Sequence, residues 1–498
     1  MSALSFVLKL LAKRAIKKSI SDQKNALMHQ ENILKNIVSR GKSSLFLKDL
    51  HHPLLKNYSD FMLNIPVSGY ESYRKYIDLI SLGHKTILTC DSPIYFAITS
   101  GTTSGTKYIP LTKKMWNFQS QAIKELLLLY AYQTDNYNFS NAAMMFIQGS
   151  PELKFLNKMP FGKLSGIAAR HVPFYLKKNR LPSMKTNSIS PWDLKIEKIV
   201  EETWDKDLQI LGGIPPWVIT YLESLLSYTK KDTAKDVFPN LKLYVHGGTS
   251  FEVYKKSFLQ LCGNIDTLEV YPASEGFFGY QNILNEKGLL LLTNHGVFYE
   301  FIALSDFNNN NTNRIPLEGV ELGVDYVMVV STIAGLWAYN TGDTVSFISK
   351  HPYKIVFSGR AAQYCSAFGE HVIEKEVQQA LNESLEKFGG TVSEFSVCPY
   401  ISTNKQQGSC HQWFIEFIMP PKNISEFAFY LNDRMRAQNI YYNDLINSGV
   451  IDVLQIYPVK SCGFNEYMKS IGKFGGQNKC PHLSNERNIG EFLLKKHV

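Results

Sequence analysis

The chain has 498 residues, 44% hydrophobic and 13% aromatic, which is enough for large buried cores in two or more domains. Its net charge is +9, but the basic residues are dispersed and no zinc-finger or RNA-binding signature occurs, so nucleic acid is not an expected partner. The seven cysteines include no C-x-x-C pair, and no apolar run is long enough to span a membrane. We therefore expect reduced thiols in a cytoplasmic protein that is a monomer or a weak dimer.

Residues 1–20 predict an amphipathic helix. Apolar residues recur there at helical spacing, at Leu4, Leu8, Leu11 and Ala15, and five basic side chains share the remaining surface. Lys9 interrupts the apolar stretch, which argues against a signal peptide. We expect this helix to pack on its own domain, with peripheral contact to a membrane surface as the alternative.

A glycine- and hydroxyl-rich segment follows the apolar run at residues 94–98, which predicts a buried strand, and a helix-like stretch begins near Thr112. Its glycines let several backbone N–H groups converge, and its hydroxyls and lysine add donors and charge. The segment therefore predicts a cradle for the β- and γ-phosphates of ATP. Its residues are Ser100, Gly101, Thr102, Thr103, Ser104, Gly105 and Lys107.

Three other motifs share these residues. A P-loop requires lysine directly after its second glycine, but here Thr106 intervenes. Ser104 and Lys107 form the S-x-x-K pair of serine acyl-enzymes, yet the flanking glycines favour a loop and no S-D-N or K-T-G follows. An ordinary surface turn stays open unless partner motifs are found elsewhere.

Strand-like and helix-like runs alternate through most of the chain, which indicates an α/β architecture. Strands are expected at residues 241–245, 268–271, 326–330 and 354–357. Because ligands bind beyond the carboxyl ends of such strands, the residues that follow them are candidates for a nucleotide site. They are Gly247, Gly248 and Thr249 for adenine, Tyr271, Ala273, Ser274 and Glu275 with the glutamate on Mg²⁺, and Asp343 for the ribose hydroxyls.

Each polar candidate has a plainer interpretation. Glu275 can be a first-turn glutamate of a helix, and Asp343 can be a hairpin-turn aspartate beside Gly342. Arg360 can reach the ribose or a phosphate, or it can be a surface arginine. Lys479, in a late glycine-rich loop, can stabilise the α-phosphate as pyrophosphate departs, or it can simply be solvated.

A domain boundary is expected near residues 358–360, where a glycine follows a strand. Residues 1–358 would form a large domain for ATP and acyl substrate. Residues 359–498 would form a smaller, mobile α+β domain with a hinge near 359–365. In this second part, a helical stripe at residues 373–385 and an alternating pattern at 413–417 predict a helix and a half-buried strand.

The acyl-substrate pocket is less sharply marked by the sequence. Residues 161–170 and 212–217 are candidate walls because they are rich in apolar, glycine and aromatic residues. Arg170 is the candidate partner of a carboxylate and Trp217 a candidate wall residue. Ordinary core packing and a surface ion pair are the alternatives.

Together these segments resemble the Gretchen Hagen 3 family of acyl-acid amido synthetases, within the adenylate-forming superfamily, over essentially the whole chain. Residues 99–105 with Lys107 resemble the first family motif, residues 271–275 the second and residues 339–343 the third. Three further segments resemble the superfamily hinge, the stretch that follows it and the late lysine loop: residues 359–360, 368–372 and 476–481.

The resemblance implies a large N-terminal α/β domain, a rotating C-terminal domain, and ATP with Mg²⁺. A carboxylic acid would be adenylated with release of pyrophosphate, and an amino acid amine would then displace AMP. Thioester ligation to coenzyme A and a non-catalytic nucleotide-binding scaffold are the alternatives. Two residues depart from the family pattern, because each stands where an arginine is frequent. Asn340, in the third motif, implies a weaker structural ion pair. His482, after the late proline, implies an altered contact with AMP or the amine.

Overall fold

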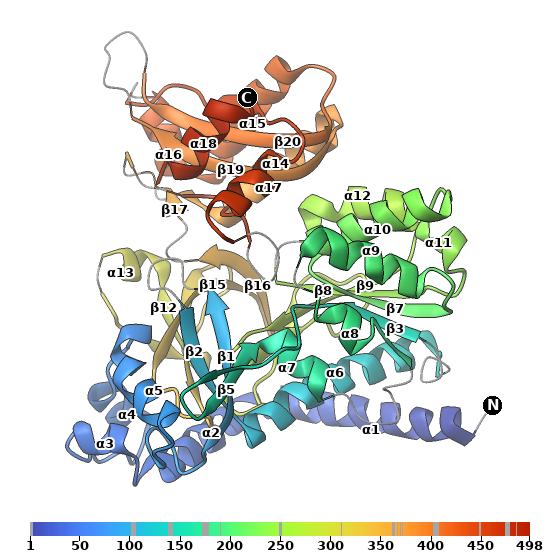
Figure 1. Cartoon of the computed structure of the whole chain (residues 1–498). Helices are drawn as coiled ribbons and strands as arrows, with labels where there is room; N and C mark the ends of the chain where they lie inside the picture. The colour runs from blue at the N-terminus through green and yellow to red at the C-terminus, as the bar shows by residue number, and fades with distance from the viewer. Residues whose placement is uncertain are drawn as a thin grey trace. The chain divides into compact units, whose positions relative to one another are not determined.

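The computed structural model describes the chain except residues 1–2, 101–105, 138–142, 172–178, 190, 249–250, 310, 361–363, 366, 369, 371, 402–407, 448–449, 474–478 and 485. It also leaves undescribed the side chains of residues 3–4, 100, 216, 253, 360, 364 and 440–441. The chain forms two compact units: residues 1–249 with 264–356, and residues 250–263 with 357–498. Helices and strands alternate in both, so the predicted α/β class is confirmed (Figure 1).

The first unit contains a twelve-stranded mixed sheet, in the order β13-β12-β14-β15-β16-β11-β10-β9-β8-β7-β3-β6. Its parallel part is β3 (Ala143–Ile147), β6 (Arg180–Leu181), β7 (Leu208–Gly213), β8 (Leu243–Gly247) and β9 (Asp266–Pro272). The other strands are β10 (Phe277–Tyr280), β11 (Leu289–Leu291), β12 (Val297–Ala303), β13 (Ile315–Pro316), β14 (Asp325–Thr332), β15 (Tyr339–Lys350) and β16 (Tyr353–Arg360). The four strands expected from apolar runs are present as β8, β9, β14 and β16.

A four-stranded sheet, in the order β2-β1-β5-β4, carries the glycine-rich segment. Its strands are β1 (Pro93–Ser100), β2 (Thr106–Thr112), β4 (Lys154–Leu156) and β5 (Met159–Lys163). β1 and β2 pair as an antiparallel hairpin, with Ser100 opposite Thr106. Thr112 then caps helix α6 (Lys113–Thr134), because its hydroxyl accepts the N–H of Met115 at 3.3 Å. The predicted strand and the predicted helix start are both confirmed.

The N-terminal helix α1 (Ala3–Lys24) packs on α6, as expected, and both lie along one face of the sheet (Figure 1). The predicted stripe is partly wrong, because Leu11 is 41% exposed whereas Ala12 is fully buried. Ala12 packs in one core cluster with Ala122 and Leu126 of α6, and this contact selects a buried face rotated from the Leu11 side. No described helix is long and apolar enough to cross a membrane.

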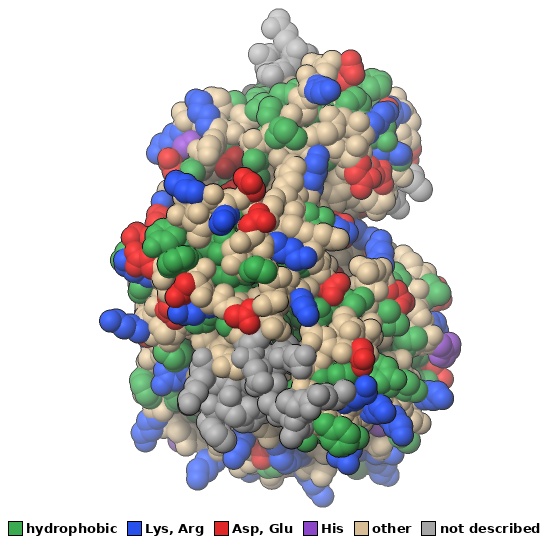
Figure 2. Space-filling view, turned by 90° about the vertical axis from the view of Figure 1, so that its right-hand side faces the viewer, with side chains coloured by type: hydrophobic (Ala, Val, Ile, Leu, Met, Phe, Trp, Pro, Cys, Tyr) green, Lys and Arg blue, Asp and Glu red, His purple; other side chains and the backbone are tan. Residues whose placement is uncertain are grey.

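The remaining helices of the first unit are α2 (Ala26–Gly41), α3 (Leu45–Asp49), α4 (Tyr58–Asn64), η1 (Tyr70–Tyr73), α5 (Arg74–Ser81), α7 (Leu164–Arg170), α8 (Met184–Asn187), α9 (Trp192–Thr203), α10 (Pro215–Thr229), α11 (Ala234–Val237), α13 (Leu304–Asn308) and η4 (Leu317–Gly319). Figure 1 shows α9 and α10 on the face of the parallel strands opposite α6. On the face drawn in Figure 2, acidic and basic side chains are interspersed among the described residues, in keeping with the dispersed charge of the sequence.

The second unit has a three-stranded sheet, in the order β19-β20-β21, and six helices in its described part. Its elements are α12 (Glu252–Cys262), β17 (Tyr364–Cys365), β18 (Val372–Ile373), α14 (Glu374–Phe388), β19 (Thr391–Tyr400), β20 (Cys410–Met419), α15 (Ile424–Gln438), α16 (Ile440–Asn447), β21 (Gln455–Pro458), α17 (Gly463–Ser470) and α18 (Asn488–Lys496).

Helix α14 confirms the apolar stripe predicted for residues 373–385, with Val377 and Leu381 fully buried. The prediction of a half-buried strand at residues 413–417 is wrong, because β20 is the central strand. Its residues from Cys410 to Glu416 are all buried, on both faces. Phe414 stands between Trp413 and Ile415, so apolar side chains occupy both faces of the strand and all three are fully buried.

Candidate functional site

The second and third motifs meet in the first unit. Tyr271, near the end of β9, donates a hydrogen bond from its hydroxyl to Asp343 Oδ2 at 2.7 Å. The two residues are 72 positions apart in sequence. A hydrogen bond to an ionised carboxylate is worth roughly 1.5–3 kcal/mol, so this contact fixes the orientation of Asp343.

Asp343 lies on a bulge of β15. Val329 pairs with Asn340 whereas Val327 pairs with Thr344, which leaves three residues of β15 opposite one residue of β14. Gly342 at the bulge has a φ of +77°, a conformation that glycine adopts without strain. Since β15 continues through the bulge, the hairpin-turn interpretation of Asp343 is wrong.

Asn340 helps to build this bulge. Its side-chain Oδ1 accepts the N–H of Gly342 at 2.8 Å, and its own N–H donates to the carbonyl of Ser68 at 2.9 Å. The hydroxyl of Thr341 accepts the N–H of Asp343 at 3.1 Å. At the position where an arginine is frequent, this chain therefore uses a short amide side chain to shape the backbone that carries Asp343.

Glu275 lies at the corner between β9 and β10. The N–H of Ala273 donates to the carbonyl of Gly276 at 2.8 Å, which closes a tight turn around Ser274 and Glu275. The turn joins two antiparallel strands, so the interpretation of Glu275 as a first-turn helix residue is wrong. Ser274 is buried, whereas Glu275 is half-buried.

Tyr339 places both carboxylates in one neighbourhood. Burial raises the pKa of the Tyr339 hydroxyl, and the negative charges of Glu275 and Asp343 raise it further, because a phenolate beside two carboxylates is disfavoured. Tyr70 also acts electrostatically on Tyr339. The Tyr70 hydroxyl accepts the N–H of Tyr108 at 2.9 Å, and Tyr108 follows directly after Lys107 on β2. Contacts therefore connect the phosphate-loop hairpin to the region of Glu275 and Asp343.

The tip of this hairpin, residues Gly101, Thr102, Thr103, Ser104 and Gly105, lies outside the described residues, as does Thr249. The backbones of Ser100 and Arg360 end β1 and β16, but their side chains are not described. Lys107 pairs with Thr99 across the hairpin. Because the segment joins strand to strand, it differs from a P-loop, which joins a strand to a helix.

Gly247 has a packing reason for being glycine. A Cβ there would lie 2.2 Å from the carbonyl oxygen of Val270 on the neighbouring strand β9. Gly248, which follows β8, has a φ of +86°. The structure thus accounts for both glycines through the backbone, and their contact with adenine stays a prediction.

The two acyl-pocket candidates occupy structural positions. Arg170 is exposed at the end of α7, and its Nη1 donates to the carbonyl of Pro151 at 3.1 Å. Trp217 is buried on α10 with its ring centroid 5.0 Å from that of Trp192. Trp217 therefore agrees with ordinary core packing, whereas the contact of Arg170 is to a backbone carbonyl, and its pairing with a carboxylate stays a prediction.

Lys479 and His482 belong to the second unit, whereas Glu275 and Asp343 belong to the first. Lys479 is exposed. His482 is buried, and its ring nitrogens contact two carboxylates: Nδ1 lies 2.8 Å from Glu374 Oε1 and Nε2 lies 3.0 Å from Glu394 Oε1. In this structure both ring nitrogens of His482 are thus engaged by carboxylates of its own unit, and an effect of this histidine on contact with AMP or the amine stays a prediction. Neither glutamate was singled out in the sequence.

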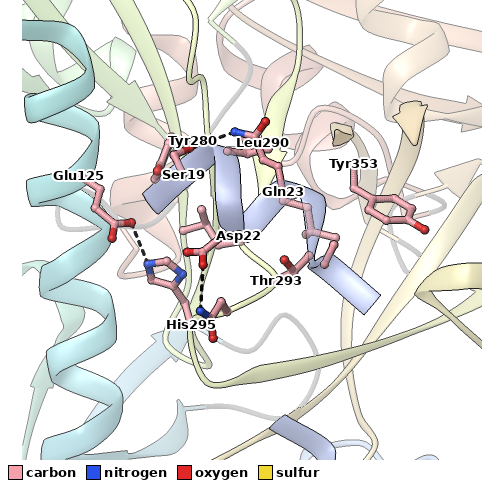
Figure 3. A pocket seen from close by; sticks show the side chains of 13 residues that line it. Ser19, Asp22, Gln23, Glu125, Tyr280, Leu290, Thr293, His295 and Tyr353 are labelled. Carbon is pink, nitrogen blue, oxygen red and sulfur yellow. Dashed lines mark hydrogen bonds and ion pairs between the residues drawn. The ribbon is translucent and has the colours of Figure 1, made fainter. Parts of the chain in front are cut away.

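A pocket beneath α1 contains none of the sequence-predicted residues (Figure 3). Its polar lining is an ionic network in which Glu125 Oε2 lies 3.1 Å from His295 Nε2, and Asn294 donates to Asp22 at 3.1 Å. Burial alone would raise the pKa of Glu125, but the hydrogen bond and charge of His295 lower it to about 2. Lys18 adds a second cation, 3.0 Å from Glu125. The charged side chains of this pocket thus pair with one another, and the contacts of Lys18 and Asp22 hold α1 in place.

The fold is that of adenylate-forming enzymes. A structure titled AtGH3.15 acyl acid amido synthetase in complex with 2,4-DB superimposes with a TM-score of 0.78 at 18% identity, covering 98% of this chain and 96% of that one. A 2-hydroxyisobutyryl-CoA ligase in its postadenylation state gives a TM-score of 0.60 at 12% identity, covering 96% and 92%.

The chain belongs to the GH3 family, which confirms the resemblance seen in the sequence. Models of the family's N-terminal, central and C-terminal domains match residues 15–198, 290–360 and 375–488. Among curated relatives, probable indole-3-acetic acid-amido synthetase GH3.1 of Arabidopsis thaliana is 21% identical, covering 95% of this chain and 92% of its own length. Indole-3-acetic acid-amido synthetase GH3.15 of the same plant is 38% identical over 90 residues, which span 18% of this chain and 15% of that protein.

Proposed function

We propose that this chain is an ATP-dependent acyl-acid amido synthetase, which joins a carboxylic acid to an amino acid through an acyl adenylate. The observation that carries the proposal is the hydrogen bond between Tyr271 and Asp343, with Glu275 in the same neighbourhood. It brings together two family motifs at the end of β9 and on a bulge of β15, where α/β enzymes of this kind hold ligands. Membership in the GH3 family supports the same reaction.

The reaction proceeds in two displacements. An oxygen of the substrate carboxylate attacks the α-phosphorus of ATP, and pyrophosphate leaves. The amine of the amino acid then attacks the acyl carbon, loses a proton and expels AMP. Positioning and charge stabilisation contribute most of the rate in such phosphate chemistry, so the residues below are assigned to holding and neutralising groups.

Asp343, oriented by Tyr271, accepts hydrogen bonds from the ribose hydroxyls. Ser100 through Gly105 and Lys107 hold the β- and γ-phosphates, with Gly247 to Thr249 against adenine. Glu275 suits Mg²⁺, because its half-buried carboxylate stands at a strand corner in the neighbourhood of Asp343, and hard cations prefer such oxygens. That ion, when bound, neutralises charge on the triphosphate.

The second unit contributes the remaining groups. Lys479 stabilises the α-phosphate as pyrophosphate departs, and Arg360, at the end of β16, contacts the ribose or a phosphate. We infer two domains, residues 1–358 and residues 359–498, joined by a hinge near 359–365. Movement of the smaller domain about this hinge lets one nucleotide site serve both half-reactions. We place the enzyme in the cytoplasm as a monomer or weak dimer, which cell fractionation and size-exclusion chromatography with light scattering would check.

The experiment that tests the proposal screens pyrophosphate release against pools of carboxylic acids, with and without pools of amino acids. We expect acid-dependent pyrophosphate release and, with amino acids present, an amide product and AMP by mass spectrometry. Asp343→Ala should bind ATP at least about tenfold more weakly, because one carboxylate hydrogen-bonded to a ligand is worth roughly 1.5–3 kcal/mol.

Two outcomes would contradict the proposal. A thioester formed when coenzyme A replaces the amines, together with no amide from any amino acid, would identify an acyl-CoA ligase. Tight ATP binding without pyrophosphate release in any acid pool would identify a nucleotide-binding scaffold. Unchanged ATP affinity in Asp343→Ala would overturn the ribose assignment alone.

A further inference from the structure

Three side chains of different chemistry meet inside the second unit, outside the proposed nucleotide site. Cys365 comes from β17, Glu370 from the segment that follows, and His411 from the central strand β20. All three are fully buried. Their ligand atoms, one thiol sulfur, one carboxylate oxygen and one imidazole nitrogen, all lie within 4.8 Å of one another.

One separation in the cluster matches an edge of a coordination tetrahedron, and a second is a few tenths of an ångström shorter than such an edge. With Zn–S near 2.3 Å and Zn–N near 2.05 Å, a tetrahedral angle sets sulfur and nitrogen about 3.5 Å apart. Cys365 Sγ and His411 Nε2 are 3.5 Å apart. The corresponding N–O edge would be about 3.3 Å, and His411 Nε2 lies 2.9 Å from Glu370 Oε1. A carboxylate shift of a few tenths of an ångström would complete that edge.

The hydrogen-bond donors available to the three side chains also favour a cation at the centre of the cluster. His411 Nε2 faces both the thiol and the carboxylate, but one N–H can serve only one of them well. A divalent ion can contact the imidazole nitrogen, the sulfur and the carboxylate at once; on binding, the Cys365 thiol releases its proton to solvent, and the charge of the ion is balanced by one thiolate and one carboxylate. A neutral cluster suits a buried position.

The surroundings hold these groups in place. Glu370 Oε2 accepts the N–H of Phe368 at 2.8 Å, which orients the other carboxylate oxygen toward His411. The rings of Phe368 and Tyr442 flank His411, with centroid separations of 6.3 and 5.0 Å. A catalytic thiol in such a place would be out of reach, because Cys365 has no exposed surface. The geometry therefore fits a structural site and not a nucleophile.

We propose that Cys365, Glu370 and His411 bind one Zn²⁺. A mixed sulfur, nitrogen and oxygen donor set is characteristic of zinc, whereas Mg²⁺ and Ca²⁺ select oxygen ligands alone. Among the described residues, this cluster consists of these three side chains. The ion joins Cys365, at the end of the expected hinge, and Glu370, just after it, to the central strand β20 of the same unit.

The test begins with the full-length protein, purified without chelator or histidine tag. Elemental analysis should find about one zinc per chain. Cys365→Ser and His411→Gln should each lower zinc affinity at least about tenfold, since even the outer partners of zinc ligands are worth 10–100-fold. Cys262→Ser is the matched control, because Cys262 is an equally buried thiol of the same unit and should leave zinc content unchanged.

A second measurement needs no variant. The wild-type protein is stripped with a chelator, loaded with Co²⁺ and examined by absorption spectroscopy. A thiolate-to-cobalt charge-transfer band with intense visible bands would confirm a tetrahedral site with sulfur. Three results would each overturn the proposal. They are absence of that band, a wild-type protein that retains no zinc after zinc loading and dialysis, and equal zinc content in Cys365→Ser and wild type. None of these outcomes depends on the acid or amine used by the enzyme.

Discussion

Replacing His482 with glutamine should destabilise the second unit in a pH-dependent way. His482 is buried between Glu374 and Glu394, and its ring stacks on Phe395 with a centroid separation of 4.3 Å. Burial alone would lower the pKa of His482, but the two carboxylates outweigh it and raise the pKa to about 10. The histidine is thus a cation throughout the physiological range, in the place of the arginine frequent in the family.

The magnitude follows from what the substitution leaves behind. Glutamine keeps a hydrogen-bond donor but no charge, so buried Glu374 and partly buried Glu394 lose their counter-ion. Removing one partner of a buried ion pair costs about 3–5 kcal/mol. We expect a loss of that order in the free energy of unfolding of the second unit at pH 6–7.

The sign of the pH dependence follows from proton binding. Between the ordinary histidine pKa of 6.5 and the folded value of about 10, the folded unit binds one proton more than the unfolded chain. The free energy of unfolding therefore falls by about 1.4 kcal/mol per pH unit across that window. His482 contributes its full stabilisation below pH 6.5 and loses it as the pH approaches 10. His482→Gln should lack this slope.

The assay is urea unfolding at several pH values, followed by a brief deuterium pulse at one common pH. Mass spectrometry of peptides from β19 and β20 then reports the second unit alone, which matters because a chain of two units need not unfold in one step. His497→Gln is the matched control: His497 Nε2 lies 3.2 Å from Glu466, which is 56% exposed, so its loss should cost about 1 kcal/mol or less. Equal midpoints and equal pH slopes in His482→Gln and wild type would refute the reasoning.

Three further predictions concern the nucleotide site and the N-terminus. Tyr271→Phe should weaken ATP binding about tenfold with little change in kcat, because it frees the orientation of Asp343; unchanged ATP affinity in calorimetry would count against this. Lys479→Ala should slow adenylation by about 10²-fold while leaving ATP affinity nearly unchanged, and unchanged turnover would overturn its role. The protein should not float with anionic liposomes, because α1 already packs on α6; co-flotation abolished by Phe6→Glu with Leu10→Glu would instead establish the membrane alternative.

Much of the fold could be predicted because continuous apolar runs mark buried strands. The run at residues 94–98 lies within β1, and that at 268–271 within β9. The face of α1 could not be predicted in the same way. Apolar residues occur on several sides of that helix, and only contact with α6 selects Ala12 over Leu11.

The sequence predicted individual residues of the candidate site but not the contacts between them. The motif order predicted both Tyr271 and Asp343 at strand ends; Tyr271 lies near the end of β9, whereas Asp343 lies within β15, where the bulge leaves it half-exposed. Their hydrogen bond depends on the arrangement of β9 and β15 within one sheet. The buried clusters around His482 and His411 gave no local signal. Their partners lie 41 to 108 positions away, and their convergence depends on how β19, β20 and α14 pack.

Both carboxylates of the proposed nucleotide site stand where the regular sheet is interrupted. Side chains of a regular strand alternate between two covered faces, so a carboxylate within such a strand would be buried against apolar neighbours. Glu275 avoids this at the corner between β9 and β10, and Asp343 avoids it on the bulge of β15. The paired residues on either side keep each interruption rigid. Irregular backbone within a fixed sheet thus leaves these two carboxylates accessible while their positions stay defined. The proposed nucleotide site needs both properties, because charge stabilisation of phosphate transfer requires charged groups at fixed positions.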